Sequence, residues 1–312
     1  MQSGAPGRLM QRMDERPQSP LRGILWMVVT GFCFVMVTAL VKMLGGRIPA
    51  TESAFLRYLL GLVFLLPLWR SLSATRLTRR QWGLFTLRGA CHTIGVGCWF
   101  FAMTRIPIAE VTAMNYLNPI GVSILAVIFL GERMAMRRIL AICAALAGAV
   151  IILRPGFREL DPGHFAMLVT AGTFSCSYLV AKILSDETDA TVVVALLSVM
   201  VTIGLAPFAM LNWVWPNLYE LGVLACVALF ATAGHYTMTL AFASAPVTVT
   251  QPVTFLQLVW SVIVGAAFFA EPPDPFVIAG GAIIIAAVSF ITWREAQLKK
   301  QGVTPPIHAT KQ

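Results

Sequence analysis

Residues 107–132 read PIAEVTAMNYLNPIGVSILAVIFLGE, and their layout returns 139 positions later, at residues 246–271, as PVTVTQPVTFLQLVWSVIVGAAFFAE. Each copy begins at a proline and ends at a glutamate. Both copies are apolar for roughly the length that crosses a bilayer, yet both carry amides and hydroxyls in mid-run. Because polar groups in hydrocarbon need partners, polar positions that recur in two copies indicate a polar interior between helices.

The composition indicates a membrane protein. Of the 312 residues, 58% are hydrophobic and 12% are charged, and the mean hydropathy of +0.78 is too high for a soluble domain of this size. A spanning helix needs roughly 20 mostly apolar residues. Ten such runs can be placed, at 23–43, 51–69, 82–104, 108–130, 137–153, 163–183, 190–211, 218–243, 246–270 and 275–293.

Basic residues predict the orientation. With ten spans and a cytoplasmic N-terminus, 16 Lys and Arg residues fall on the cytoplasmic side and five fall outside. The outer five are Lys42, Arg47, Arg105, Arg154 and Arg158. This distribution follows the positive-inside rule, so the net charge of +9 reports topology and implies no nucleic-acid partner. We expect a disordered cytoplasmic tail at 1–22 and a cytoplasmic C-terminal tail at 294–312.

The repeat extends over both halves of the chain. A shift of 140 positions places Phe174 on Phe34, and a shift of 139 positions places Glu271 on Glu132. Because each half holds five spans, an odd number, the second half must be inverted relative to the first. We therefore predict an all-α membrane protein with ten transmembrane helices in two inverted five-helix repeats and both termini inside. The predicted repeats are residues 23–155 and 156–293.

Three segments resemble the EamA-repeat family of the drug/metabolite transporter superfamily. They are ESAFLRYLLGLVFLLP at 52–67, FFAMTRIPIAEVTAMNYLNPIGVSILAVIFLGER at 100–133 and IILRPG at 151–156. The resemblance covers residues 23–293 and implies a carrier. Similar members export amino acids or drugs, or import vitamins, nucleoside derivatives or S-adenosylmethionine, so the resemblance does not identify a substrate. The second half departs from the first in having Leu197 at the position of Arg57.

Polar residues of the fourth and ninth spans share one helix face. In the ninth span this face consists of Thr250, Thr254, Gln257 and Ser261, at i, i+4, i+7 and i+11. The 139 shift makes Asn115 equivalent to Thr254 and Asn118 equivalent to Gln257. Helix–helix hydrogen bonding would explain these amides and hydroxyls. Their repetition favours a central cavity, and we predict that Asn115, Asn118, Thr254 and Gln257 line it.

Prolines interrupt the same two spans. Pro119 follows Asn118, and Pro252 lies in the ninth span. Each proline removes a backbone donor and leaves a carbonyl free on the preceding turn. A plain kink would explain both prolines, and local unwinding at a binding site is the alternative.

Aromatic, hydroxyl and histidine side chains supply further candidates for the cavity. They are Phe34 and Thr38 in the first span, His92 and Trp99 in the third, Phe174 and Tyr178 in the sixth, and His235 and Thr239 in the eighth. Rings beside hydroxyls suit an amphipathic small molecule, although a packed interface would show the same pattern. Histidines within a membrane are candidates for proton exchange, with a satisfied neutral histidine as the simpler explanation.

A charged pair is predicted near the outer surface. Arg57 lies six residues inside its span, about 9 Å by helical rise, and enters from the side where Glu110 should lie. An arginine in mid-bilayer costs about 2.5–3.5 kcal/mol, so a partner is expected. An Arg57–Glu110 pair or gate is our hypothesis, whereas Glu132 and Glu271 are expected only to fix helix ends.

Several classes of protein are excluded. There is no nucleotide-binding loop, so the chain is not a self-contained ATP-driven pump. No metal spacing and no nucleophile–base motif occurs, so we predict no catalytic residue, metal or cofactor. Acidic residues are confined to span ends and loops, so we expect no buried carboxylate that would bind sodium or relay protons.

We therefore expect a secondary transporter of the inner membrane that moves a small polar or amphipathic metabolite by alternating access through a central cavity. Amino-acid or metabolite export is favoured, and import of S-adenosylmethionine, riboflavin or a similar cofactor is the alternative. If the protein is not a transporter, it would be a membrane-embedded enzyme or sensor. The expected partners are the lipid bilayer and a small-molecule substrate. Small residues at Ala141, Ala145, Ala149 and Gly281 predict close helix packing, within one chain or in a homodimer.

Overall fold

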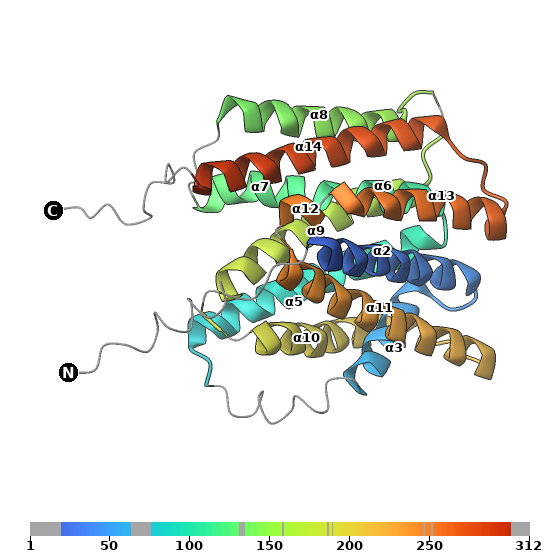
Figure 1. The fold of residues 1–312 in the computed structure, drawn as a ribbon. Coiled ribbons are helices and arrows are strands. Elements are labelled where there is room, and N and C mark those ends of the chain that lie inside the picture. The colour runs from blue at the N-terminus through green and yellow to red at the C-terminus, as the bar shows by residue number, and fades with distance from the viewer. Residues whose placement is uncertain are drawn as a thin grey trace.

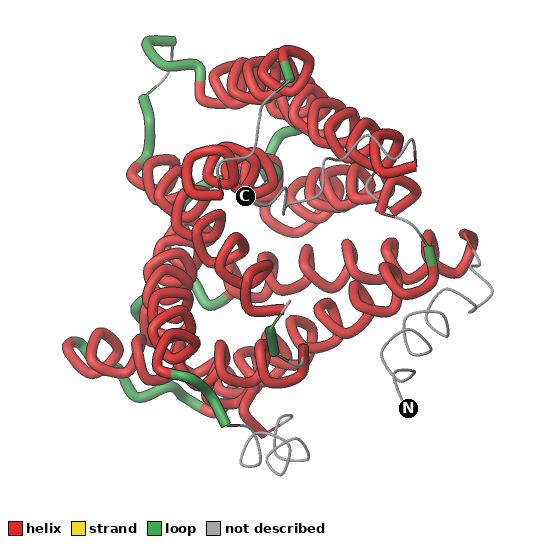
Figure 2. Tube along the Cα trace, turned by 90° about the vertical axis from the view of Figure 1, so that its left-hand side faces the viewer, coloured by secondary structure: helices red, strands yellow, loops and turns green. Residues whose placement is uncertain are grey.

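The computed structural model describes most of the chain as helices joined by short loops (Figure 2). The described residues are 20–63, 76–130, 135–157, 159–185, 187–188, 190–245, 247–250 and 252–300. No β-strand occurs within these ranges, which confirms the all-α prediction. Glu132, Arg158 and most of both predicted tails lie outside them.

The helices of the two halves follow the same order. In the first half they are α2 (Pro20–Met43), α3 (Ala50–Gly61), α5 (Arg79–Met103), α6 (Ile108–Asn115), α7 (Leu117–Leu130) and α8 (Met136–Leu153). In the second half they are α9 (Pro162–Ser185), α10 (Ala190–Leu211), α11 (Leu218–Ser244), α12 (Val247–Thr250), the 3₁₀ helix η2 (Pro252–Thr254), α13 (Phe255–Phe269) and α14 (Pro275–Lys300). Several helix ends differ from the prediction. For example, α2 starts at Pro20 instead of 23, α5 starts at Arg79 instead of 82, and α14 continues to Lys300 instead of 293.

Seven helical segments of the described chain are long and apolar enough to cross a membrane, with α6 and α7 counted together. The second, third and ninth predicted spans are not among these seven segments. The helix α5 has 25 residues but begins with two arginines, α13 has 15 residues, and α3 has 12. A helix of 12 residues spans about 18 Å, less than the hydrocarbon core of about 30 Å. The rest of that predicted span, beyond residue 63, lies outside the described residues.

The third and eighth spans begin with the same capping arrangement. Thr78 accepts a hydrogen bond from the backbone of Gln81, and the Gln81 side chain accepts one from the Thr78 backbone at 2.9 Å. Asn217 and Glu220 repeat this reciprocal arrangement at the start of α11. Each box satisfies backbone N–H groups that a first helical turn leaves without partners. The repeat is therefore kept down to the first residues of equivalent helices.

Helices of the two halves pack against one another in exchanged pairs. The main neighbour of α2 is α11, and that of α5 is α9. Under the repeat α2 is equivalent to α9 and α5 to α11, so these two interfaces are copies of each other. The equivalent helices α8 and α14 lie side by side at the top of Figure 1. This pattern is expected when the halves are related by a two-fold axis, and buried residues from both halves form one core.

Glycines allow close contact between the halves at both ends of the molecule. A Cβ atom at Gly23 would lie 2.3 Å from the Cβ of Ala245, and one at Gly163 would lie 2.9 Å from Cγ2 of Ile106. Gly23 is equivalent to Gly163, and Ala245 is equivalent to Ile106. We name the end with Gly163 and Ile106 the outer end and the end with Gly23 and Ala245 the inner end, after the orientation that the charges predict.

The small residues of the fifth and tenth spans pack within one chain. Ala145 is fully buried. A Cβ at Gly148 would lie 2.7 Å from the carbonyl oxygen of Gly280, and one at Gly280 would lie 2.5 Å from that of Gly148. These residues therefore serve the contact between α8 and α14, and a homodimer stays a prediction.

Candidate substrate site

His92 and Phe174 form the centre of an aromatic cluster between α5 and α9. Their rings stack with centroids 4.6 Å apart and planes inclined by 23°. Tyr178 meets His92 edge-on at 6.3 Å, and Trp99 meets Phe174 edge-on at 6.3 Å. Gly95 permits this approach, because a Cβ there would lie 2.5 Å from the Phe174 ring. Four of the predicted cavity residues thus come together.

Both ring nitrogens of the buried His92 have hydroxyl partners. Nδ1 lies 3.1 Å from Oγ of Ser177, and Nε2 lies 3.1 Å from the hydroxyl of Tyr58. A hydroxyl donates or accepts as needed, so a neutral imidazole satisfies both contacts. Arg57 lies over the Tyr58 ring, 4.0 Å from its centroid, which places a fixed positive charge beside this network. The neutral histidine is therefore sufficient to explain His92.

Two of the predicted cavity residues carry a buried polar atom that has no hydrogen-bond partner within the described part of the chain. The two atoms are Nε1 of Trp99 and Oδ1 of Asn118. Trp99 contacts Phe174, and the next residue on α9, Ser175, donates to the backbone carbonyl of Asn118 at 3.0 Å. One atom is a donor and the other is an acceptor, and burial makes both costly while unsatisfied. A bound polar molecule would gain hydrogen bonds here.

The cluster is open at one member. Tyr178 is 40% exposed, although the rings it contacts, His92 and Phe174, are 8% and 5% exposed. An open side chain packed on buried rings gives a ligand a way to reach them.

Phe34 and His235 form the counterpart of this cluster between α2 and α11. Their ring centroids are 5.2 Å apart with planes at 79°. Phe34 is equivalent to Phe174, and Gly234, the equivalent of Gly95, again allows the approach, since a Cβ there would lie 3.3 Å from the ring. The two histidines are not equivalent by position. Both phenylalanine–histidine contacts therefore join the two halves, and they use histidines at non-equivalent positions.

Two predicted cavity threonines, Thr38 and Thr239, lie on the helices α2 and α11 that form this counterpart. Thr38 is buried and donates to the backbone carbonyl of Phe34 at 3.1 Å, a bond within α2. Thr239 lies on α11 four positions after His235, and its side chain is outside the description. A structural role therefore accounts for Thr38.

The fourth and ninth spans are both broken near the predicted polar face. The single residue Tyr116 separates α6 from α7, and η2 separates α12 from α13. Asn115 is the last residue of α6, just before α7, and its equivalent Thr254 is the last residue of η2, just before α13. Pro119 explains the first break, because it lacks the N–H that the carbonyl of Asn115 would accept from. Tyr116 stays in the right-handed helical region (φ −67°, ψ −8°), which fits a plain kink, whereas the ninth span contains a turn of 3₁₀ helix, which fits local unwinding.

The two breaks are bonded to each other. The hydroxyl of Tyr116 donates to the carbonyl oxygen of Thr254 at 2.8 Å. Gln257 lies against α2, where a Cβ at Gly31 would be 3.4 Å from its Cβ, and Asn115 is partly exposed. The predicted polar face therefore lies at two equivalent interfaces, with Asn118 between α7 and α9 and Gln257 between α13 and α2.

Arg57 and Glu110 have partners other than the ones predicted. Arg57 is 8% exposed and stacks on Tyr58. Glu110 is 3% exposed, and its Oε2 lies 2.6 Å from Nε2 of His164. In this structure two separate contacts replace the predicted Arg57–Glu110 pair, because the fold brings the start of α9 against the start of α6.

The expectation that no carboxylate is buried is wrong. Glu52, Glu110 and Glu220 are 0%, 3% and 5% exposed. All three lie in the first turn of a helix, where the helix dipole favours a negative charge. Glu271, after α13, accepts from the N–H of Ile108 at 2.9 Å and forms an ion pair with Lys42. The sequence located these residues at span ends correctly, and tertiary packing buries the ends.

Some contact residues were not singled out in the sequence. They are Tyr58, Tyr116, His164, Ser175 and Ser177. Ser175 and Ser177 lie between the predicted Phe174 and Tyr178, so a search for hydroxyls along that segment would have found them. His164 offered no such signal, because its partner belongs to the other half.

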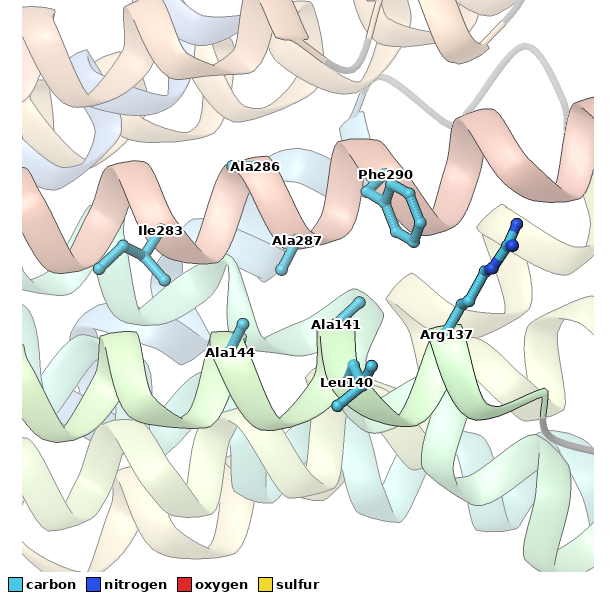
Figure 3. A pocket seen from close by; sticks show the side chains of 8 residues that line it. All are labelled: Arg137, Leu140, Ala141, Ala144, Ile283, Ala286, Ala287 and Phe290. Carbon is cyan, nitrogen blue, oxygen red and sulfur yellow. The ribbon is translucent and has the colours of Figure 1, made fainter.

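Two grooves lie away from the aromatic cluster. One, of about 240 Å³, is at the outer end and is lined by Glu110, Glu271 and Asp274 among prolines and apolar residues. The other, of about 410 Å³, runs between α8 and α14 and is apolar apart from Arg137 at one end (Figure 3). Neither is lined by the predicted cavity residues, so a central cavity stays a prediction.

Comparison with known proteins gives consistent matches. The EamA-like transporter family matches residues 21–154 and 161–293. An S-adenosylmethionine uptake transporter of Rickettsia prowazekii (strain Madrid E) is 25% identical, over 91% of this chain and 96% of its own. A riboflavin transporter of Rhizobium johnstonii is 29% identical, over 91% and 95%. The pseudopaline exporter CntI of Pseudomonas aeruginosa (strain UCBPP-PA14) is 26% identical, over 85% and 94%. One solved structure shares the fold, with a TM-score of 0.56 at 18% identity over 90% of this chain and 97% of that chain.

Proposed function

Since the chain belongs to the EamA-like transporter family, within the drug/metabolite transporter superfamily, and is a multi-pass protein of the inner membrane, we propose that it is a secondary carrier for a small amphipathic metabolite. The substrate would bind between the halves and be exposed to each side in turn. The exchanged helix pairs support this mechanism, because two equivalent interfaces allow the halves to rock about a central site.

The observation that carries the choice of substrate is the aromatic cluster together with the two unsatisfied atoms. A planar ring bearing polar groups would stack near His92 and Phe174, accept from Nε1 of Trp99 and donate to Oδ1 of Asn118. Relatives are named for riboflavin and for S-adenosylmethionine, both of which contain a planar heteroaromatic ring. A ring-bearing metabolite is therefore the substrate class that we favour.

Export of a small amino acid, favoured from the sequence, has less support. Most small amino acids have no planar ring that could stack near His92 and Phe174. The contact that distinguishes the favoured substrate class would therefore be missing.

Transport by the purified chain in proteoliposomes tests the proposal. Counterflow of labelled riboflavin, S-adenosylmethionine and a mixture of amino acids reads movement in either direction. We expect flux of a ring-bearing probe. Turnover of a probe without flux would instead favour a membrane-embedded enzyme.

Two variants test the site itself. Phe174→Ala removes a stacked ring, and aromatic contacts of about 0.5–1.5 kcal/mol predict a 2- to 12-fold weaker apparent affinity. Asn118→Leu removes the buried acceptor and should also weaken binding. Phe157→Ala is the control, because that ring is 91% exposed and outside the site. Equal behaviour of all three variants would refute the proposed site.

The orientation is part of the proposal. Both termini should be cytoplasmic, because 16 basic residues fall inside and five outside in that orientation. A fluorescent protein fused after residue 312 should fluoresce, and alkaline phosphatase fused at the same place should be inactive. The opposite pair of results would reverse the names of the two ends.

A further inference from the structure

Arg57 and Arg88 are two buried positive charges within the predicted membrane spans, 8% and 6% exposed. Arg57 lies on α3 and stacks on the ring of Tyr58, 4.0 Å from its centroid. Arg88 lies on α5, one turn before His92, and its Nη1 donates to the backbone carbonyl oxygen of Val193 at 2.8 Å. Neither guanidinium group takes part in the ring stacking of the proposed substrate site.

Both arginines lie close to the aromatic cluster around His92. The hydroxyl of Tyr58, on whose ring Arg57 stacks, is 3.1 Å from Nε2 of His92. The charges of Arg57 and Arg88 both act on His92, and the charge of Arg88 also acts on Tyr58 and Tyr178. Two different helices therefore bring a positive charge to the same group of rings.

Neither arginine has a carboxylate partner among the described residues. Other basic side chains with low exposure do form ion pairs, for example Lys42 with Glu271 and Arg154 with Asp274. Nε of Arg88 is buried and also lacks a hydrogen-bond partner in the described chain. Burial of a charge without a counter-ion is costly, and ionisable residues inside a membrane are candidates for binding sites. The arrangement therefore suits an anion that is supplied from outside the chain.

We propose that Arg57 and Arg88 bind an anionic group of the substrate, a carboxylate or a phosphate, so that the substrate is a ring-bearing metabolite with one such group. This inference rests on the proposed carrier function and narrows its substrate class. A guanidinium group donates charge-assisted hydrogen bonds to either kind of anion, often two at a time. With the ring stacked near His92 and Phe174, the attached anionic group would lie on the side of Tyr58.

The two charges are confined to the first half of the chain. The repeat places Leu197 at the position of Arg57 and Val227 at the position of Arg88. The phenylalanine–histidine contact therefore occurs twice, whereas the pair of arginines occurs once. One anionic group at one end of the ring matches this arrangement better than an anionic group at each end.

Matched pairs of ligands test the anion site. Each pair shares a ring, and only one member is an anion: riboflavin and flavin mononucleotide, adenosine and adenosine monophosphate, nicotinamide and nicotinate. Equilibrium dialysis of each labelled ligand against the purified full-length protein in detergent measures its Kd. We expect the anionic member of at least one pair to bind about 10- to 100-fold more tightly, which is the range for hydrogen bonds to charged groups.

Arginine variants connect this preference to the site. Arg57→Gln and Arg88→Gln should remove most of the preference, because glutamine keeps a donor without the charge. Arg57→Lys keeps the charge and should retain part of the preference. The melting temperature without ligand reports whether each variant is folded. The ligand pairs are also compared in the unmodified protein, so that comparison does not depend on the folding of a variant.

Arg105→Gln is the matched control. Arg105 also stacks on a ring, 4.4 Å from the centroid of Phe101, but it is exposed and lies beside Gly163 at the outer end. This variant should bind every ligand as the unmodified protein does.

The absence of a preference for the anionic member in every pair would overturn the anion site, and so would a preference that Arg57→Gln and Arg88→Gln leave unchanged. Inorganic phosphate that competes as strongly as the anionic ligand would also overturn it, because the arginines would then hold a free anion only. These results leave the carrier proposal to be decided by flux in proteoliposomes. An arginine-dependent preference without flux of any probe would keep the site and refute the carrier.

Discussion

The outer and inner ends are related by the repeat but are stabilised by different chemistry. At the outer end, the Glu110–His164 contact and the Lys42–Glu271 ion pair are largely buried. At the inner end, the ion pair of Arg80 and Glu187 has side chains 63% and 33% exposed. A symmetric scaffold therefore carries asymmetric interactions at its two ends.

One bridge occurs at both ends with its charges exchanged. Arg47, in the loop after α2, pairs with Glu220 at the start of α11. Glu187, the equivalent of Arg47, pairs with Arg80 at the start of α5. The hydrogen bond to Glu220 raises the pKa of Arg47, and the hydrogen bond from Arg80 lowers the pKa of Glu187. Both bridges join the halves, with the arginine in the first half and the glutamate in the second half each time.

The largest effect is expected from Glu271→Ala at the outer end. It removes the partner of Lys42 and the acceptor of the Ile108 N–H, at a place where the two charged side chains are 18% and 12% exposed. Breaking a mostly buried pair costs about 3 kcal/mol, which is roughly 6–10 °C in the melting temperature. Thermal unfolding in detergent measures it. Glu271→Gln keeps an acceptor for the Ile108 N–H, so its melting temperature should fall less. If Glu271→Ala lowers the melting temperature no more than Arg80→Ala does, the outer end is not stabilised more strongly than the inner end.

The next effect comes from the glycines where the halves meet. Gly23→Ala should cost about 2 kcal/mol, because its Cβ would lie 2.3 Å from the Cβ of Ala245. Gly163→Ala should cost about 1 kcal/mol, since the atom it meets, Cγ2 of Ile106, can rotate away. The melting temperatures should rank in that order. Gly172→Ala, with nothing within 4 Å, is the control and should not destabilise. The reverse order would show that the helices pack less tightly around Gly23 at the inner end than around Gly163 at the outer end.

A smaller effect is expected from the exchanged bridges. Arg80→Ala should lower the melting temperature by less than about 2 °C, because exposed ion pairs contribute little. Arg47→Ala should lower it more, since its partner Glu220 has a side chain only 7% exposed. Equal shifts would mean that burial does not distinguish the two bridges.

The smallest effect concerns the pH response of the inner bridge. The pKa of Glu187 is lowered, so its contribution is complete above the ordinary value of 4.5 and is lost as the pH falls through the lowered pKa. The difference in melting temperature between the unmodified protein and Glu187→Gln should therefore be constant from about pH 6 to 9. A difference that changes across that range would show that another group at the inner end changes its protonation there.

The repeat predicted more of the site than composition did. It identified Phe34 with Phe174, and Asn115 with Thr254. In the structure each phenylalanine lies beside a histidine of the other half, and Asn115 and Thr254 each lie at a break between helices. The Glu110–His164 contact was not predictable in this way. Periodicity shows which residues share a face of one helix, whereas this contact depends on which helices meet and joins residues 54 positions apart. For the same reason periodicity could not show that Arg57 stacks on Tyr58.

The hydrogen bond from Tyr116 to Thr254 has a consequence for movement. It joins the two places where the backbone of the fourth and ninth spans is least regular. A movement at one break must therefore carry the other break with it or break this hydrogen bond. In the proposed carrier cycle, the Tyr116 hydroxyl would link the two breaks.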